Sequence, residues 1–261
     1  MNRSAIKPAA VAGATVVVLL LLWQAIVVTA HVKTYLVPAP SKIFSVMVEQ
    51  RAVLWQDSLV TLEEILIGYA IAVLLGIGVA VVIARSIHLR AVLAPLLVAM
   101  QVVPKIAVAP LFVVWFGFGI EAKVLMTILI TFFPIVTDTL AGLLAEPTER
   151  RDLSAVMGLS AWARFWKVEM PGALPHIFAG LKVGLTLAVI GAIVAEFVGA
   201  NAGLGYLMQL ANGDLDTPLI FAGLTVITAW GMLLYGLISA IEALMMPWHV
   251  SRRHSAITAG G

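Results

Sequence analysis

The chain has 261 residues, of which 62% are hydrophobic and only 11% are charged, and its formal net charge is +2. This composition lies far outside the range of soluble globular domains. The absence of cysteine excludes a disulfide framework and any thiol chemistry. The composition therefore predicts a membrane protein.

Six apolar stretches are long enough to cross a membrane, since a spanning helix needs about 20 residues. They cover residues 9–30, 59–84, 91–116, 124–144, 177–200 and 219–246. The first stretch is too long for a signal peptide and lacks a convincing cleavage site, so we interpret it as a membrane anchor. Together the stretches predict a single all-α transmembrane domain over residues 1–261.

The distribution of Lys and Arg predicts the orientation, because the cytoplasmic loops of membrane proteins are enriched in both residues. With a cytoplasmic N-terminus, ten cations fall on the inner side and four on the outer side. The inner ones are Arg3, Lys7, Arg85, Arg90, Arg150, Arg151, Arg164, Lys167, Arg252 and Arg253, and the outer ones are Lys33, Lys42, Arg51 and Lys123. Both termini are therefore expected to face the cytoplasm.

The longest polar loop, residues 146–176, joins the fourth and fifth stretches on the predicted cytoplasmic side. Ser160 is a good N-cap residue, and Gly158 can adopt the left-handed conformation that ends a helix. Pro171 and Pro175 disfavour the continuation of a helix. The loop is therefore expected to contain two short helices that meet at a corner near Gly158.

This loop is both charged and apolar. It carries Arg151 and Asp152 beside Trp162, Phe165 and Trp166, and a loop that is merely solvated would not expose three aromatic side chains. Aromatic residues dominate the energy of many protein interfaces, so we interpret the loop as a docking site for another protein. For the tryptophans, a belt at the membrane interface is an alternative, since aromatic rings favour the depth of the lipid headgroups.

No pattern typical of a catalytic or metal site occurs in the sequence. The five histidines are far apart and show neither His-x-x-His nor His-Glu-x-x-His spacing. The patterns Gly-x-Ser-x-Gly and Gly-x-x-x-x-Gly-Lys-Ser/Thr are both missing. We therefore expect a chain that is not an enzyme, binds no metal or cofactor, and depends on a separate subunit for any ATP that it uses.

Ionisable residues inside apolar stretches mark candidate functional positions, because a charge at the membrane centre costs about 2.5–3.5 kcal/mol on insertion scales. Lys105 lies near the middle of the third stretch, directly after Pro104, and Glu196 lies in the outer half of the fifth. Prolines free backbone carbonyl groups, which a membrane tolerates only where protein or water satisfies them. We therefore predict a polar cavity at Lys105, with Lys105 and Glu196 as candidate residues of a translocation path.

Several interpretations stay open at this level. Lys105 lines a path, pairs structurally with an acid such as Glu196, or extends to the membrane surface. Glu63 and Glu64 favour a simple acidic pair at the membrane interface. Small residues recur every four positions from Gly180, which favours close packing within the chain or at an axis between two copies. The segment 203–205, Gly-Leu-Gly, indicates either a flexible outer turn that gates a path or a plain loop.

Several motifs then occur together and in order. The loop contains Asp152-Leu153-Ser154, Gly158 and Val168-x-Met170-Pro171, which resembles the Glu-Ala-Ala loop of bacterial ABC importer permeases. Other segments are similar to the nitrate, sulfonate and taurine branch of that family: Val37-Pro-Ala-Pro40, residues 103–117, Phe132-Phe-Pro-Ile135, Ala195-Glu-Phe197, Gly203-Leu-Gly205 and Pro247-Trp248. Leu153 and Ser154 replace the two alanines, so the first loop helix is expected to pack differently on its partner.

The resemblance implies a MetI-like permease with six transmembrane helices, in which a substrate path runs along the two-fold axis of a homodimer. It implies two ATPase subunits on the cytoplasmic loop, an extracytoplasmic solute-binding protein, a place in the bacterial inner membrane and no nucleic-acid partner. The implied solute is small and anionic, similar to nitrate, a sulfonate or taurine. The implied docking residues are Arg151, Asp152, Ser154, Gly158, Ser160, Trp162, Phe165, Trp166 and Pro171.

A self-sufficient secondary transporter or channel is the alternative, since six spans and buried charges would also serve such a protein. It would have no need for an apolar two-helix loop on its cytoplasmic face. No inverted repeat of hydropathy is apparent in the sequence either. The sequence therefore favours the membrane subunit of an ATP-driven importer.

Overall fold

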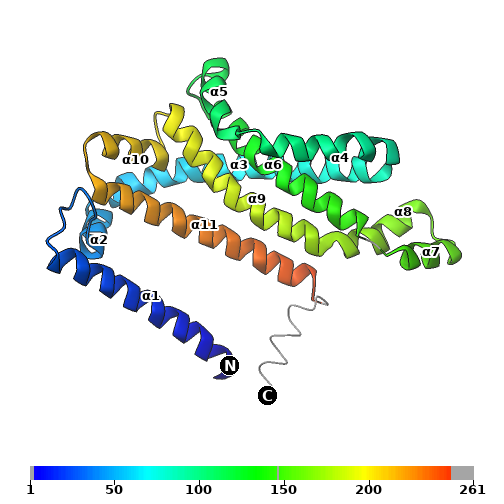
Figure 1. Cartoon of the computed structure of the whole chain (residues 1–261), viewed down its shortest axis with the longest axis horizontal. Coiled ribbons are helices and arrows are strands. Elements are labelled where there is room, and N and C mark those ends of the chain that lie inside the picture. The colour runs from blue at the N-terminus through cyan, green and yellow to red at the C-terminus, as the bar shows by residue number, and fades with distance from the viewer. Residues whose placement is uncertain (1–2, 146, 248–261) are drawn as a thin grey trace.

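The computed structural model describes residues 3–145 and 147–247, and within them leaves out the side chains of residues 3–9, 12, 148, 151, 152 and 155 (Figure 1). The described residues form helices and turns, with no β-strand among them. The helices are α1 (Arg3–Thr29), α2 (Pro40–Glu49), α3 (Arg51–Arg85), α4 (Ile87–Val102), the 3-10 turn η1 (Lys105–Val108), α5 (Ala109–Phe116), α6 (Ile120–Leu144), α7 (Thr148–Val156), α8 (Ala161–Arg164), the π-helical turn η2 (Phe165–Glu169), α9 (Met170–Gly199), α10 (Leu204–Gly213) and α11 (Thr217–Met245).

Four helical runs of the described chain are long and apolar enough to cross a membrane: α3, α6, α11 and the continuous run Ala161–Gly199 that ends with α9. A fifth candidate is α4 together with η1 and α5, although its two parts are bent by 78°. α1 contributes a shorter apolar segment, Gly13–Thr29. The all-α class with several apolar spans is therefore confirmed, while the count of six and the cytoplasmic position of both termini stay predictions.

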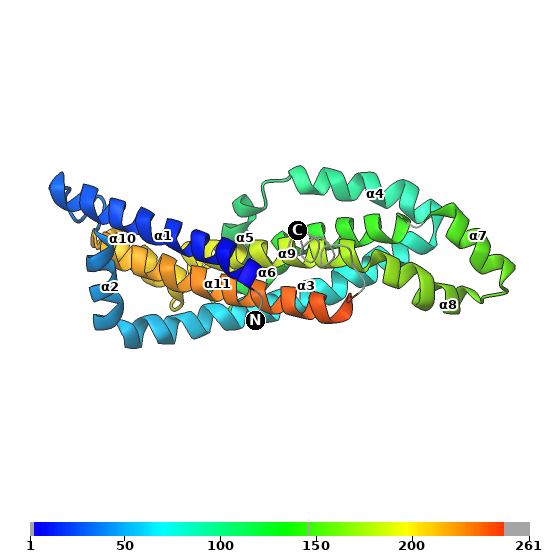
Figure 2. The ribbon, with the colours of Figure 1, turned by 90° about the horizontal axis from the view of Figure 1, so that it is seen from below.

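The third predicted stretch, 91–116, is not one continuous helix. α4 ends at Val102, and Val103 is extended, with φ −60° and ψ 127°. Proline restricts the residue before it to this region, because its ring clashes with a helical neighbour. Pro104 therefore separates α4 from η1 and turns the chain sharply. None of the residues of α4 is buried within the chain, and α4 runs along the outside of the bundle (Figure 2).

α6 lies between α3 and α9, and glycines of both outer helices allow the close approach. A Cβ atom at Gly76 of α3 would lie 2.8 Å from the Ile135 side chain of α6, and one at Gly184 of α9 would lie 2.9 Å from the same side chain. A Cβ atom at Gly180 would lie 2.8 Å from Cβ of Asp138. The small residues of α9 thus serve packing within the chain.

Replacement of Gly76 by Ala is expected to destabilise the protein by about 1–3 kcal/mol, because the added methyl group meets a β-branched side chain in a packed interior. Gly78 in the same helix is the matched control, since no atom lies within 4 Å of a Cβ atom there. Gly78→Ala should leave stability unchanged or raise it slightly. Thermal unfolding in detergent measures both, and equal effects would contradict this account of the packing.

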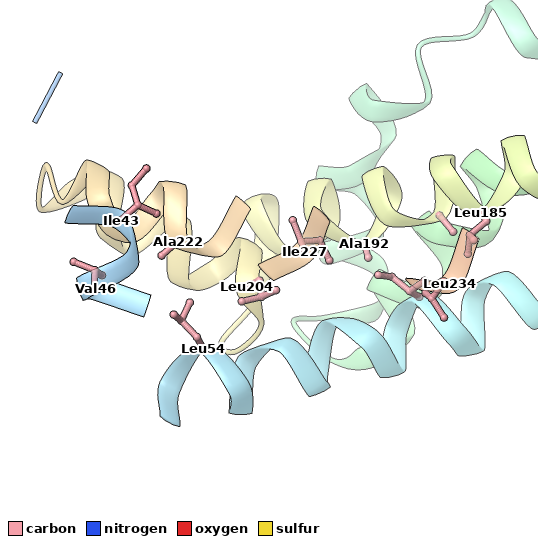
Figure 3. Close-up of a cluster of buried hydrophobic side chains, with 11 residues drawn as sticks. Ile43, Val46, Leu54, Leu185, Ala192, Leu204, Ala222, Ile227 and Leu234 are labelled. Atoms are coloured by element: carbon pink, nitrogen blue, oxygen red, sulfur yellow. The ribbon is translucent and has the colours of Figure 1, made fainter. Parts of the chain in front are cut away.

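α2, α10 and one end of α1 lie at the end of the molecule opposite to α7 and α8, and α11 runs from that end along α9 (Figure 1). α1 contacts it through Trp23, whose ring centroid lies 5.8 Å from that of Phe221 in α11. Gln24 of α1 also donates a hydrogen bond of 3.0 Å to Ser41 of α2. A buried apolar cluster then connects α2, α3, α9, α10 and α11 (Figure 3); its labelled members are Ile43, Val46, Leu54, Leu185, Ala192, Leu204, Ala222, Ile227 and Leu234.

Candidate functional site

The loop between α6 and α9 folds into the predicted pair of helices. α7 ends at Val156, and Gly158 takes the left-handed conformation with φ +69°. The Leu159 N–H donates to the Ser154 carbonyl at 3.1 Å, which closes the helix end. The Ser160 hydroxyl accepts a hydrogen bond of 3.2 Å from the Ala163 N–H and caps α8. The corner at Gly158 and the cap at Ser160 are thus confirmed.

The expected stop at Pro171 and Pro175 is wrong. α8, η2 and α9 form one continuous run from Ala161 to Gly199. At η2 the backbone widens into a π-helical turn, in which the Met170 N–H donates to the Phe165 carbonyl. This extra residue in the turn gives Pro171 room, because a normal α-turn would bring its ring against the carbonyl four residues earlier. The loop therefore continues directly into a candidate membrane span.

The three aromatic residues of the loop have two different roles. Trp162 is 69% exposed and Trp166 is 49% exposed, and their rings meet edge to face with centroids 5.6 Å apart. Phe165 is only 5% exposed, so the expectation that it is also exposed is wrong. Its ring packs under the Arg85 guanidinium at the end of α3, 4.3 Å from the ring centroid. Phe165 thus connects the loop to α3, and the tryptophans face outward.

Five large apolar side chains of the loop are exposed. They are Leu153, Val156, Met157, Trp162 and Trp166, and we name this set the docking surface.

Other side chains of the loop are less exposed or form an ion pair. Ser154 is buried and Pro171 is half-buried. Arg164 makes an ion pair with Glu169, with 3.0 Å between Nε and Oε1. The side chains of Arg151 and Asp152 lie outside the described residues, so their docking role stays a prediction.

Lys105 lines an open cavity of about 460 Å³ between α4, η1, α6 and α9. Its Nζ donates to the Gln101 carbonyl at 3.1 Å and lies 5.0 Å from the centroid of the Phe133 ring. The Gln101 amide in turn donates to the Thr137 hydroxyl at 3.3 Å. The lining residues are Gln101, Val103, Lys105, Ile106, Ile130, Pro134, Leu187 and Ile190, with no acid among them. A cavity at Lys105 is thus present, but only Gln101 and Lys105 make it polar, and the rest of its lining is apolar.

Glu196 does not line the Lys105 cavity. It is fully buried, and its carboxylate accepts hydrogen bonds from the Thr61 hydroxyl and the Gly205 N–H. The alternative of a Lys105–Glu196 structural pair therefore finds no support in the described contacts. A path role for either residue stays a prediction.

Lys123 and Thr61 are polar residues of the interior that the sequence reasoning missed. Lys123 is buried in α6 and forms an ion pair with Glu64 of α3, whereas Glu63 is exposed. The interpretation of Glu63 and Glu64 as one interfacial pair is therefore wrong. Opposite charges near the outer ends of neighbouring predicted spans were the available signal, but matching them requires knowing which helices touch.

Comparisons with known proteins agree with this architecture. The family model described as the binding-protein-dependent transport system inner membrane component matches residues 72–250. The chain is 37% identical over 239 residues to the riboflavin transport system permease protein of Chloroflexus aurantiacus, covering 91% of this chain and 89% of that protein.

Two further relatives are named for other solutes. The formylaminopyrimidine transport permease protein of Halalkalibacterium halodurans is 35% identical over 233 residues, with 88% and 92% of the two chains covered. The taurine transport system permease protein of Escherichia coli is 31% identical over 242 residues, with 90% and 88% covered. This chain therefore belongs to the family of binding-protein-dependent transport system inner membrane components, and it is a membrane permease of an ABC importer.

Proposed function

We propose that this permease works as a homodimer that binds two ATPase subunits on its cytoplasmic face and passes a small anionic solute from an extracytoplasmic binding protein across the bacterial inner membrane. Both termini of each copy lie in the cytoplasm in this proposal. The relatives are named for three different solutes. The Lys105 cavity, and not those names, supports an anionic solute.

The docking surface is the observation that supports binding of the ATPase. Its five side chains are between 49% and 85% exposed. An apolar surface of this kind on a cytoplasmic loop is typical of a protein interaction site, and tryptophans are common anchors of such sites. Because this chain has no phosphate-binding loop of its own, a nucleotide-binding subunit is the partner that supplies the missing chemistry.

Movement of the ATPase can reach the membrane helices through two connections of the docking loop. One is covalent, since α8 and η2 continue into α9. The other is the contact of Phe165 with Arg85 at the end of α3. Phe165 also packs with Leu143 of α6 and Ile177 of α9. A push on the loop would therefore displace α3, α6 and α9 together.

The Lys105 cavity is evidence for two parts of the proposal, namely a second copy of the chain and an anionic solute. An ammonium group beside a broken helix cannot face lipid without a large cost, yet the cavity is open and α4 buries none of its residues. A second copy related by a two-fold axis would cover this face and bring two Lys105 side chains to one path. Lys123 and Lys182 each pair with an acid, whereas the described contacts of Lys105 include none. The two Lys105 side chains of the dimer, with no acid in the lining of either cavity, would favour an anionic solute.

The purified complex is expected to contain two copies of this chain and two ATPase subunits. Native mass spectrometry from detergent measures this ratio directly, with the permease expressed alone as the control. A complex with one permease copy for each pair of ATPase subunits would contradict the homodimer, and so would a second, different permease in the complex.

A further inference from the structure

Polar side chains of α3 and α9 lie at the N-terminus of α10. The Glu196 carboxylate of α9 accepts a hydrogen bond of 2.7 Å from the Thr61 hydroxyl of α3 at one oxygen, and accepts the Gly205 N–H of α10 at the other. The Thr61 oxygen itself accepts the Leu204 N–H at 2.8 Å. Glu196 and Thr61 together therefore satisfy the first two N–H groups of α10, groups that have no partner inside a helix.

This arrangement is an N-cap supplied by neighbouring helices. The residue that precedes α10 is Gly203, which has no side chain for capping, and its N–H donates to Asp57 of α3 at 3.0 Å. A carboxylate at a helix N-terminus also interacts favourably with the helix dipole. We name Asp57, Thr61 and Glu196 the α10 clamp.

The clamp explains why glycine occurs at positions 203 and 205, in the turn that leads into α10. Gly203 has φ +111°, a conformation that other residues rarely adopt, and a Cβ atom there would overlap the Glu196 carboxylate. A Cβ atom at Gly205 would lie 2.7 Å from an oxygen of the same carboxylate. Three side chains thus hold the turn in this conformation, and a gating movement of the turn stays a prediction.

The clamp lies at the far end of a long continuous helical run. The run Ala161–Gly199 begins beside the docking surface and passes Glu196 one turn before it ends. At 1.5 Å per residue its 39 residues extend about 58 Å. α10 and the docking helices α7 and α8 accordingly lie at opposite ends of the molecule (Figure 1).

Resting on the permease function proposed above, we propose that Glu196 is a positioning residue that makes α10 move together with α9. The state of the ATPase at the docking surface is then passed along α9 to α10 on the opposite side of the membrane, where the solute-binding protein arrives. Asp57 and Thr61 make α3 part of the same unit.

The first test asks whether the clamp holds α10. Because the chain has no cysteine, Met208→Cys gives a single thiol at a position of α10 that is 2% exposed. Adding Thr61→Val removes the hydroxyl at nearly constant volume and with it the hydrogen bonds to Glu196 and Leu204. The maleimide labelling rate at position 208 should rise by about tenfold or more, since both of these buried hydrogen bonds are lost. Thr61→Ser, which restores the hydroxyl, should return the rate to its starting value.

Two matched controls belong to this test. Thr225→Val removes an exposed hydroxyl that bonds only within its own helix, and it should leave the labelling rate unchanged. Gly205→Ala places a methyl group too close to the Glu196 carboxylate and should raise the labelling rate. Gly213→Ala, at the other end of α10, has open space around its Cβ atom and should leave the rate unchanged. An unchanged rate in both Thr61→Val and Gly205→Ala would overturn the clamp.

The second test asks whether the clamp carries a signal. In the full complex with ATPase and binding protein in liposomes, Thr61→Val and Gly205→Ala should keep basal ATP hydrolysis but lose its stimulation by the loaded binding protein. Full stimulation in variants with a raised labelling rate would overturn the role of Glu196 in coupling. If the unaltered chain forms no complex with the ATPase, the proposed function fails, while the labelling result still decides on the clamp itself.

Discussion

Trp162→Ala is expected to weaken the association of the permease with its ATPase by about 30-fold or more, since central tryptophans of interfaces commonly contribute at least about 2 kcal/mol. The side chain is 69% exposed in the chain alone, and its ring meets that of Trp166 edge to face. Its replacement removes apolar area from an exposed position and leaves the buried residues in place. Titration of the detergent-solubilised permease with the labelled ATPase measures the dissociation constant.

Trp115→Ala is the matched control for this experiment. Trp115 in α5 is 63% exposed, similar to Trp162, but belongs to another part of the molecule. Its replacement should leave the dissociation constant unchanged. Gly158→Pro should act like Trp162→Ala, because proline cannot adopt the φ of +69° found at the corner. Equal affinity in Trp162→Ala, Gly158→Pro and the unaltered permease would contradict the docking surface.

Lys105→Met is expected to reduce uptake of an anionic solute by about tenfold or more, the effect of losing one charge-assisted hydrogen bond. Met keeps the length and apolar volume of the side chain, so the change removes mainly the charge. Lys105→Arg should retain part of the uptake, because it keeps the cation but alters its shape. Initial rates of uptake into proteoliposomes measure the effect.

Lys42→Met removes an exposed cation outside the cavity and should leave uptake unchanged. Lys105→Met itself should still bind the ATPase with full affinity, because the docking surface lies elsewhere in the molecule. Normal uptake in Lys105→Met would exclude Lys105 from the path. A combined loss of uptake and ATPase binding would indicate a folding defect and would contradict the role proposed for the cavity.

Local features of the loop could be predicted because they depend on a few neighbouring residues. The corner at Gly158 and the cap at Ser160 follow from backbone preferences within one turn. The same reasoning failed at Pro171, because it assumed a regular α-helix. A π-helical turn over Phe165–Glu169 accommodates the proline, and nothing in the local sequence distinguishes such a turn from a stop.

Features that depend on contacts between helices could be predicted only in kind. A buried charge requires a partner, and the sequence places Glu64, Lys123 and Glu196 in or near predicted spans. The charge distribution predicts that Lys123 lies in an outer loop, yet it pairs with Glu64 inside the bundle. Glu196 instead bonds to Thr61 and to the backbone of α10. Which partner each charge finds depends on helix packing, which no single helix specifies.

ATP-driven uptake by the reconstituted complex tests the central claim most directly. Proteoliposomes are prepared with this chain, its ATPase and the loaded solute-binding protein, and solute entry is measured with ATP on the side of the docking surface. Uptake is expected to require all three proteins and hydrolysable ATP, and to fall when Trp162→Ala weakens docking. Uptake by this chain alone, without ATPase or ATP, would contradict the account and establish a self-sufficient carrier.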